Sequence, residues 1–394
     1  MDEPTADRPV TSTPAAALPI LPNWIEVDLA AIRHNVALMK ALVGPGVEII
    51  GVVKANAYGH GAGPVAKAAL QGGATRLAVV NVAEAVELRQ EGIEAPIMVM
   101  LPATQEAAAA AGPLGLELVV CDLDGIRALN GRGEAAGERY RVHLKVDTGM
   151  CRYGASGGTV AACVQAIVAA RSLELIGVCS HLAASEEPAA EFTQAQVERF
   201  AAAAEEVRRT TGQPIPRHLA NSAAAVRFPG ARFEAIRMGL SIYGLPACPE
   251  VAAIGLRPAL TWRARVLQVR GAKAGETVSY GRTYTVPRDT RVAVVPVGYA
   301  DGYPRALSSS AEMLVRGQRA PVRGVVCMDS TVLDVGHIPG VTVGDEVVVL
   351  GQQGNETITA GELAERAGTI VYEIIARLGS RPQRIYLNLS ERGG

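Results

Sequence analysis

The sequence predicts a parallel (β/α)8 barrel followed by a mostly antiparallel β domain. Between residues 48 and 238, short apolar runs rich in β-branched residues alternate with longer Ala-rich amphipathic stretches. Continuous apolar runs separated by helices are typical of parallel strands that are buried on both faces. Beyond residue 258 the pattern changes to apolar and polar residues in alternation, broken by Gly and Asp turns. That pattern is typical of antiparallel strands.

Eight candidate strands match the number that a (β/α)8 barrel requires in about 200–250 residues. They are expected at residues 48–53, 76–81, 96–101, 116–120, 141–146, 173–180, 217–221 and 233–238, after a helix over 28–42. A doubly wound open sheet is the alternative, but the number of repeats favours the barrel. In the β domain a short helix is expected over 359–368, because Thr359 is a suitable N-cap with Glu362 three positions later.

These elements divide the chain into three parts. Residues 1–22 are expected to form a disordered Ala/Pro-rich extension, since they lack the basic and apolar regions of a signal peptide. Residues 23–257 are assigned to the barrel and 258–394 to the β domain. The segment "NWIEVD" at 23–28 would suit a strand in either domain, and the sequence does not decide between them.

Composition argues against several kinds of partner and site. A formal net charge of −1 over 394 residues gives no electrostatic footprint for nucleic acid or an anionic membrane. No apolar run approaches the roughly 20 residues needed to span a bilayer. The six cysteines are scattered without metal-ligand spacing and are interpreted as reduced thiols. We therefore expect a cytoplasmic protein without a metal site.

Polar residues occur where the barrel strands are expected to end, which is where barrel sites form. Lys54 ends the first strand, Ser222 stands at the strand-to-helix junction after the seventh, and Gly239 follows the eighth. The loops after the last two strands cradle phosphate in many barrels, although a lone serine there is more often a helix N-cap. A lysine across the mouth from a phosphate site suits Schiff-base chemistry. A sugar-phosphate aldolase and a pyridoxal-phosphate enzyme both fit this pattern.

Longer motifs distinguish these two enzyme classes. The stretch "VVKANAYGHG" at 52–61 resembles the cofactor-lysine motif of the alanine racemases, pyridoxal-phosphate enzymes of fold type III. The resemblance extends from residue 24 to the end, through "WIEVDLAAIRHNV" (24–36), "LKVDTGMCRYG" (144–154), "HLANSAA" (218–224), "IRMGLSIYG" (236–244), "VSYGRTYT" (278–285), "VGYADGYP" (297–304), "VCMD" (326–329) and "GTIVYEI" (368–374). It implies a homodimeric, pyridoxal-phosphate-dependent racemase that interconverts L-alanine and D-alanine and supplies D-alanine for peptidoglycan.

The resemblance also implies roles for individual residues around the cofactor. Lys54 resembles the lysine that holds the cofactor covalently, and Arg237 the residue that faces its pyridine nitrogen. His181 resembles the histidine that stacks on the ring and bonds Arg237, and Asn221 borders the same face. The residues that resemble the phosphate shell are Tyr58, Ser222, Gly239, Leu240 and Tyr372.

Further roles concern the substrate and the second catalytic base. Tyr299 resembles that base, which in the family comes from the other subunit together with Met328. Arg152 resembles the arginine that contacts both the substrate carboxylate and this tyrosine. Lys145 resembles a lysine that is often carbamylated in the family and that holds this arginine in place. Racemisation needs two opposed acid/base groups, which Lys54 and Tyr299 would supply. Neither works at its reference pKa of about 10, so burial and nearby cations must tune both.

Three positions depart from the family pattern. Cys151 stands where glycine is common, Val325 where an arginine often occurs, and Glu186 where aspartate is usual. Without the resemblance, Lys145 would be interpreted as a buried lysine paired with an aspartate such as Asp147. His143 is expected to pack inside the barrel without a role of its own.

Alternatives to an alanine-specific racemase remain at this level. A bulky aromatic at Tyr372, with Met328, favours a small substrate side chain, but one methylene discriminates by only about 1–3 kcal/mol. The same scaffold could therefore serve a serine or broad-specificity racemase. A non-catalytic pyridoxal-phosphate carrier lacks the second domain, and an aldolase needs neither that domain nor Tyr299.

Overall fold

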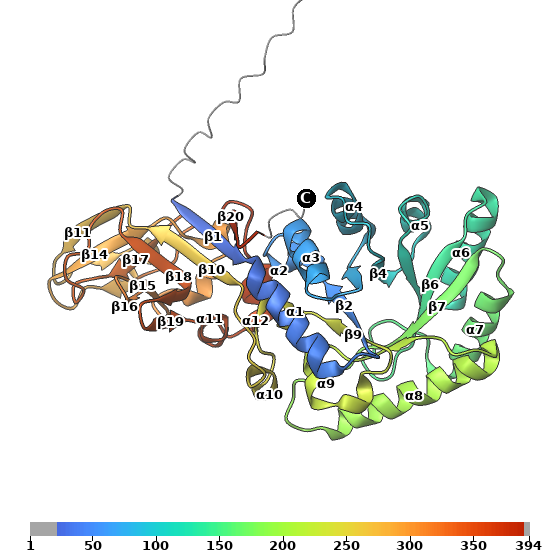
Figure 1. Cartoon of the computed structure of the whole chain (residues 1–394). Coiled ribbons are helices and arrows are strands. Elements are labelled where there is room, and N and C mark those ends of the chain that lie inside the picture. Colours follow the sequence, from blue (N-terminus) through green and yellow to red (C-terminus); the bar gives the residue numbers. More distant parts are fainter. Residues whose placement is uncertain (1–21, 390–394) are drawn as a thin grey trace, which may run out of the picture.

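Eight parallel strands close into a barrel in the computed structural model, which describes residues 22–389 (Figure 1). Strand β2 pairs with both β3 and β9, which closes the ring. The barrel strands are β2 (Glu48–Val52), β3 (Arg76–Val79), β4 (Ile97–Pro102), β5 (Glu117–Val120), β6 (Tyr140–Lys145), β7 (Leu173–Cys179), β8 (Arg217–His218) and β9 (Ala235–Met238). The predicted barrel is confirmed, with every strand at its predicted place in the sequence.

Helices cover the outside of the barrel. Several begin at a side chain that accepts a backbone N–H, as Asp28 does from Ala30 at 2.8 Å and Asp122 does from Gly125 at 2.7 Å. The barrel helices are α1 (Leu29–Val43), α2 (Lys54–Tyr58), α3 (Ala62–Gln71), α4 (Val82–Gln90), α5 (Gln105–Ala111), α6 (Leu123–Ala136), α7 (Val160–Ala169), α8 (Glu191–Thr211) and α9 (Ser222–Arg227). The short helix α10 (Pro249–Ala252) leads towards the second domain. No helix between residues 22 and 389 is long and apolar enough to cross a membrane.

The C-terminal domain is built on a seven-stranded sheet beside two smaller ones. The large sheet has the order β16-β15-β18-β10-β1-β20, with β19 paired to β18. Its strands are β1 (Asn23–Asp28), β10 (Leu260–Arg265), β15 (Glu312–Val315), β16 (Gln318–Pro321), β18 (Glu346–Gln353), β19 (Glu356–Ile358) and β20 (Gln383–Leu387). The smaller sheets contain β11 (Gln268–Ala272), β14 (Thr290–Val295) and β17 (Thr331–Asp334), and β12 (Thr277–Val278) with β13 (Tyr284–Thr285).

The first strand belongs to this C-terminal sheet, although the expected boundary placed residues 23–28 with the barrel. Strand β1 pairs antiparallel with β10 and parallel with β20. Its alternating burial suits a sheet covered on one face, with Ile25 and Val27 completely buried. The expected disorder of residues 1–22 concerns, up to residue 21, a segment outside the described residues.

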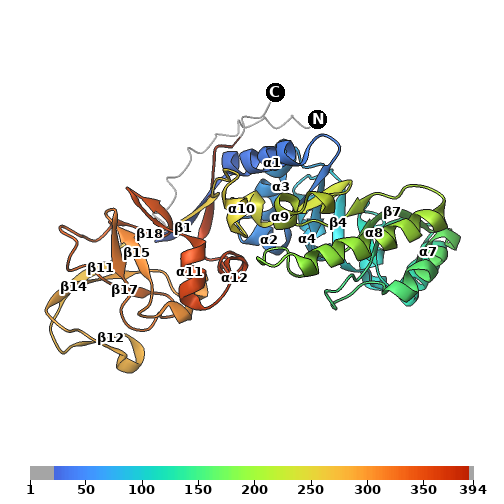
Figure 2. The same cartoon turned by 90° about the horizontal axis from the view of Figure 1, so that it is seen from below.

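Two short helices lie between the sheet domain and the barrel in both views (Figures 1 and 2). They are α11 (Ala360–Ala367) and α12 (Val371–Ala376). Helix α11 begins as predicted, because the Thr359 side chain accepts the Glu362 N–H at 3.0 Å. Short 3-10 helices occur at Gly157–Thr159, Pro229–Ala231, Leu240–Tyr243, Tyr280–Arg282, Tyr299–Asp301 and Arg305–Leu307.

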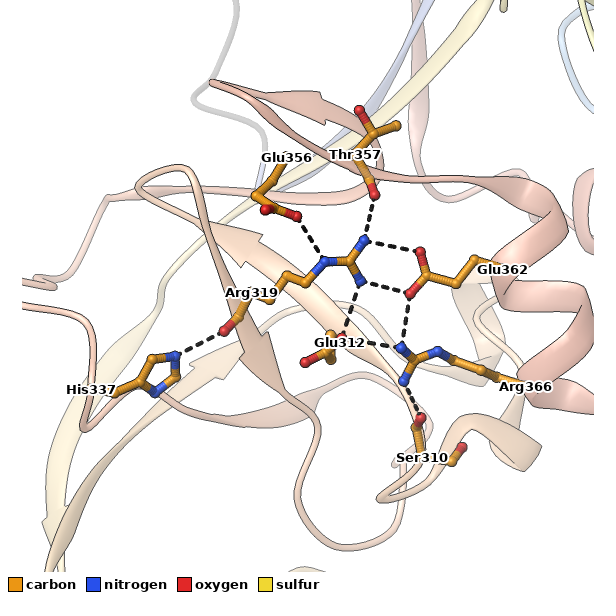
Figure 3. Close-up of polar contacts among 8 residues, drawn as sticks. All are labelled: Ser310, Glu312, Arg319, His337, Glu356, Thr357, Glu362 and Arg366. Atoms are coloured by element: carbon orange, nitrogen blue, oxygen red, sulfur yellow. Dashed lines mark hydrogen bonds and ion pairs between the residues drawn. The ribbon is translucent and has the colours of Figure 1, made fainter.

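A charged cluster joins the edge of the large sheet to α11 (Figure 3). It consists of Glu312, Arg319, Glu356, Glu362 and Arg366. The Arg319 guanidinium lies 3.1 Å from Glu312, 2.8 Å from Glu356 and 2.7 Å from Glu362. Through ion pairs, Arg319 on β16 therefore links β15, the hairpin of β18 and β19, and helix α11.

Candidate active site

A cavity of about 830 Å³ opens at the carboxyl ends of the barrel strands. Most of the residues predicted to form a site line this one cavity, although they come from the ends of five different strands and from α12. They are Lys54, Tyr58, Lys145, Arg152, His181, Asn221, Ser222, Arg237, Gly239, Leu240 and Tyr372. Tyr299 and Met328 do not line it.

The turn that holds Lys54 is left-handed. Residues Ala55 to Tyr58 have φ values of 51–52°, a conformation that costs non-glycine residues about 1–2 kcal/mol each. Contacts from outside hold the turn: the Ala55 N–H donates to Glu84 at 2.8 Å, and the Asn56 side chain accepts the Ala62 N–H at 2.8 Å. The turn directs both Lys54 and Tyr58 at the cavity.

The two glycines that follow this turn allow the domains to approach closely. A Cβ atom on Gly59 would lie 2.3 Å from the Ile375 carbonyl oxygen, and one on Gly61 would lie 1.9 Å from the Tyr386 hydroxyl. Both glycines also have positive φ values, of 81° and 100°. The end of the motif "AYGHG" is therefore required for packing against the C-terminal segment, while its beginning faces the cavity.

The cavity contains four cationic side chains: Lys54, Lys145, Arg152 and Arg237. None of them forms an ion pair within residues 22–389. Burial, and then the charge of Arg152, lowers the pKa of Lys54. Burial also lowers the pKa of Lys145, with Arg237 and Arg152 adding to the effect. Unpaired cations in a partly buried cavity favour an anionic ligand.

Arg237 is the most completely engaged of these cations. Its two terminal nitrogens donate to His218 Nδ1 at 2.9 Å, to His181 Nδ1 at 3.2 Å, and to the carbonyl oxygens of Ser180, His218 and Leu219. Its Nε–H has no acceptor in the described part of the chain. That N–H is the donor that remains for a ligand in the cavity.

Hydroxyl groups face the cavity near Gly239. Ser222 Oγ accepts the Gly239 N–H at 3.0 Å, so its own proton remains available for a ligand. The Tyr58 hydroxyl has no hydrogen-bond partner among residues 22–389, and a Cβ on Gly239 would lie 3.2 Å from it. The N-cap of α9 is Asn221, whose side chain accepts the Ala224 N–H at 2.9 Å. Ser222 is therefore not the N-cap that it would be on local sequence alone.

Tyr372 contacts an acid at the cavity wall. Its hydroxyl donates to Glu186 Oε1 at 2.7 Å, and burial together with this bond raises the pKa of Tyr372. Burial likewise raises the pKa of Tyr58, whose ring centroid lies 6.1 Å from that of Tyr372. Both phenols are therefore neutral hydrogen-bond donors at physiological pH.

The loop that carries Arg152 is organised by Asp147. The Asp147 carboxylate accepts four consecutive backbone N–H groups, from residues 149 to 152, at 2.8–3.2 Å. Asp147 makes no ion pair with Lys145, which instead lies 5.1 Å above the Tyr153 ring. Cys151 has a φ of 53°, the left-handed region that favours glycine, yet the four-bond turn is complete around it.

Tyr299 and Met328 lie together in the C-terminal domain. The Tyr299 N–H donates to the Cys327 carbonyl at 3.0 Å, and the Ala300 N–H donates to the Met328 carbonyl at 3.1 Å. Both side chains are exposed, at 40% and 51% of their surface. A Cβ on Gly298 would lie 2.2 Å from the Met328 carbonyl oxygen, so the close approach of the two loops requires glycine there.

Several residues near the cavity were not singled out by the sequence. Glu84 anchors the Lys54 turn, Tyr153 lies beneath Lys145 and Arg152, and His218 accepts from Arg237. Only His218 had a local signal, because it opens the motif "HLANSAA" at 218–224 on a predicted barrel strand, three residues before Asn221. The roles of Glu84 and Tyr153 depend on contacts with other strand ends, which the local pattern does not report.

The fold and the cavity define a two-domain barrel protein with a lysine-bearing, cationic ligand site at the strand ends. Residues 27–247 match the model of the alanine racemase N-terminal domain, and residues 259–386 match that of the alanine racemase C-terminal domain. The chain therefore belongs to the alanine racemase family, a family of isomerases, as the sequence motifs predicted.

Named relatives and solved structures agree over most of the chain. The chain is 45% identical to an alanine racemase of Symbiobacterium thermophilum over 93% of its own length and 97% of the relative. It is 42% identical to an alanine racemase of Desulforamulus reducens, over 93% of its own length and 99% of the relative. The alanine racemase of Bacillus anthracis with bound L-Ala-P superimposes with a TM-score of 0.89 at 36% identity, covering 95% of this chain and 97% of that one. The alanine racemase of Streptomyces coelicolor superimposes with a TM-score of 0.89 at 38% identity, covering 94% of this chain and 99% of that one.

Proposed function

We propose that this protein interconverts L-alanine and D-alanine with pyridoxal phosphate as cofactor, in the cytoplasm, and supplies D-alanine for peptidoglycan. The observation that carries the proposal is the cavity with four unpaired cations and free hydroxyl donors around Lys54. Such a donor set fits a ligand with a phosphate group, a carboxylate and a carbonyl carbon that can react with an amine.

The residues of the cavity fit the parts of this cofactor. The free protons of Ser222 and Tyr58, next to Gly239 and Leu240, fit the phosphate group. Tyr372 would also contact the phosphate once its hydroxyl leaves Glu186. The Nε–H of Arg237 would be donated to the pyridine nitrogen, and His181 and Asn221 would lie against the ring. Lys54 would hold the cofactor covalently; when bound, pyridoxal phosphate supplies an electron sink that acidifies the α-proton of the amino acid.

The chemistry of the two proposed bases follows from their surroundings. Burial and the charge of Arg152 lower the pKa of Lys54, so a larger fraction of this amine is neutral and able to accept a proton. Arg152 would bind the substrate carboxylate. We propose that Lys145 is carbamylated, because the modification would place a negative charge beside Arg152 and Arg237, where the structure has a buried ammonium without an ion pair.

The second base is proposed to be Tyr299 of a partner subunit in a two-fold homodimer. Tyr299 and Met328 are exposed in the single chain and do not line the cavity that contains Lys54. A site shared between two copies of the chain would bring Tyr299 to the face of the substrate opposite Lys54. Met328, with Tyr372, would then restrict the space for the substrate side chain and favour alanine over serine.

The central experiment measures racemisation and cofactor attachment on the purified protein. We expect pyridoxal phosphate to give a visible absorption band and L-alanine to lose optical rotation faster than L-serine. Borohydride reduction followed by peptide mass spectrometry should place the cofactor on Lys54, and Lys54→Ala should abolish both attachment and activity. Lys67→Ala is the matched control, because Lys67 is a surface lysine paired with Glu91 at 3.2 Å. Equal rates on the two amino acids would favour the broad-specificity alternative, and attachment without racemisation would refute the proposed activity.

Mixed subunits test whether the site is shared. Lys54→Ala and Tyr299→Phe chains, each inactive alone, are denatured together and refolded. If each site combines Lys54 of one chain with Tyr299 of the other, half of the randomly formed dimers regain one intact site of two. The mixture should then recover about a quarter of wild-type activity. No recovery, while refolded wild-type protein regains its activity, would exclude a shared site.

A further inference from the structure

A chain of polar side chains crosses the interior of the barrel beneath the cavity. Glu117, at the start of β5, lies 3.2 Å from His143 Nε2 on β6. His143 Nδ1 lies 3.1 Å from His218 Nε2 on β8, and His218 Nδ1 lies 2.9 Å from Arg237 on β9. The four side chains are between 0% and 7% exposed. Barrel interiors are usually filled by branched apolar residues, so a continuous polar chain there needs an explanation.

The direction of every hydrogen bond in this chain is fixed by its two ends. Arg237 can only donate, so His218 Nδ1 must accept and its proton must be on Nε2. His218 Nε2 then donates, so His143 Nδ1 must accept and its proton is also on Nε2. That proton points at the Glu117 carboxylate, which accepts it. Both histidines are therefore neutral, and the chain has one polarity from the guanidinium to the carboxylate.

Charge and packing agree with this direction. Burial lowers the pKa of His143 and of His218, which keeps both rings neutral. Burial would raise the pKa of Glu117, but the His143 hydrogen bond and the charge of Arg76 lower it to about 2, so the carboxylate is ionised. A Cβ on Gly177 would lie 2.2 Å from His143 Nδ1, so the position of the His143 ring requires a glycine on β7.

We propose that Glu117 is a positioning residue for the cavity, acting on Arg237 through His143 and His218. The carboxylate selects the tautomer of His143, which selects that of His218, and the His218 lone pair then fixes one arm of the guanidinium. With both terminal nitrogens committed to protein acceptors, the Nε–H of Arg237 is presented to the cavity. The consequence for catalysis rests on the proposed function, whereas the tautomers and the orientation of Arg237 do not.

Two variants separate the charge of Glu117 from its role as an acceptor. Glu117→Gln keeps an oxygen for the His143 proton but removes the negative charge. Glu117→Leu removes the acceptor and leaves the His143 Nε2–H buried without a partner, which favours the other tautomer and breaks the chain. A matched control is Glu234→Leu, because Glu234 pairs with Arg217 at 2.6 Å next to the chain without belonging to it.

The test is ¹⁵N NMR of the cofactor-loaded dimer with histidine-selective labelling, assigned through His143→Phe and His218→Phe. The wild type and Glu117→Gln should each show both rings as neutral Nε2–H tautomers, and Glu117→Leu should show a second population of His218 with the proton on Nδ1. The alanine kcat of Glu117→Leu should fall about tenfold, the lower end of the loss seen when the residue that orients a metal-bound histidine is removed, with KM within about twofold. Glu234→Leu should change neither readout.

Two results would overturn the inference. One is a cationic or Nδ1–H form of either histidine in the wild type near pH 7. The other is a Glu117→Leu variant that folds with unchanged histidine signals and unchanged kcat. If the tautomers are as stated but no racemisation occurs, the proposed function fails while the positioning role of Glu117 stands.

Discussion

Arg381 offers a test of how the C-terminal domain holds the proposed second base. Its guanidinium contacts the buried Asp301 carboxylate with two nitrogens, each at 3.0 Å. Asp301 is the last residue of the 3-10 helix Tyr299–Asp301, and it also accepts the Gly298 N–H at 2.8 Å. A further nitrogen of Arg381 lies 2.6 Å from the exposed Asp329. Arg381→Met removes all of these contacts but keeps the aliphatic part of the side chain.

The expected loss of stability follows from the exposure of each contact. Asp301 is 3% exposed at its side chain, and hydrogen bonds to a buried charged group contribute about 1.5–3 kcal/mol. Arg381 itself is 47% exposed, which places the contribution in the lower part of that range. The pair with Asp329 adds about 0–1 kcal/mol, because both groups are solvated. We expect Arg381→Met to lower the free energy of unfolding by about 1.5–3 kcal/mol and Tm by about 2–4 °C.

Calorimetry of the purified protein, with racemisation measured on the same sample, checks this prediction. The matched control is Arg377→Met, because among residues 22–389 the Arg377 side chain pairs only with Glu373, an exposed residue one helical turn away, and should contribute about 0.5 kcal/mol or less. We also expect kcat to fall by more than the loss of folded protein accounts for, because the turn that carries Tyr299 loses its contact with Arg381. A loss below about 0.5 kcal/mol for Arg381→Met would refute the view that Asp301 depends on this arginine.

Three further predictions concern other parts of the chain. Cys151→Gly should raise the free energy of unfolding by about 0.5–1 kcal/mol in urea titrations, because it relieves a positive φ; a destabilised variant would contradict this. Tyr372→Phe should weaken pyridoxal-phosphate binding about 3- to 10-fold in fluorescence titrations, since one hydroxyl donor is lost; unchanged affinity would show that this hydroxyl stays on Glu186. Burial would raise the pKa of Glu362, but the Arg319 hydrogen bonds lower it below 4.5. The contact between Glu362 and Arg319 therefore stabilises the fold above pH 4.5, and this stabilisation is lost as pH falls through the lowered pKa. Arg319→Met should therefore cost about 1–2 kcal/mol at pH 7 and progressively less below pH 4.5 in urea titrations, whereas a pH-independent deficit would argue against the charged cluster of Figure 3.

Much of the site was predictable because the chemistry-bearing residues follow strand ends. Lys54 follows β2, and Ser222 and Gly239 follow β8 and β9, so a barrel of eight strands places all three at one mouth. The motifs around them then indicated a family. The contacts of Tyr372 and Glu186 were not predictable, because these residues lie 186 positions apart and meet only when α12 closes over the barrel.

The sequence by itself determined the two kinds of architecture, the positions of the barrel strands and the residues that surround the cavity. These features depend on periodicity and on short motifs, which are local properties of the chain. Only the tertiary structure decided that β1 joins the C-terminal sheet between β10 and β20, since its sequence suits a strand in either domain and its partners are far away along the chain. The line from Glu117 through His143 and His218 to Arg237 likewise exists only in the closed barrel, because the register of four strands sets which polar side chains meet.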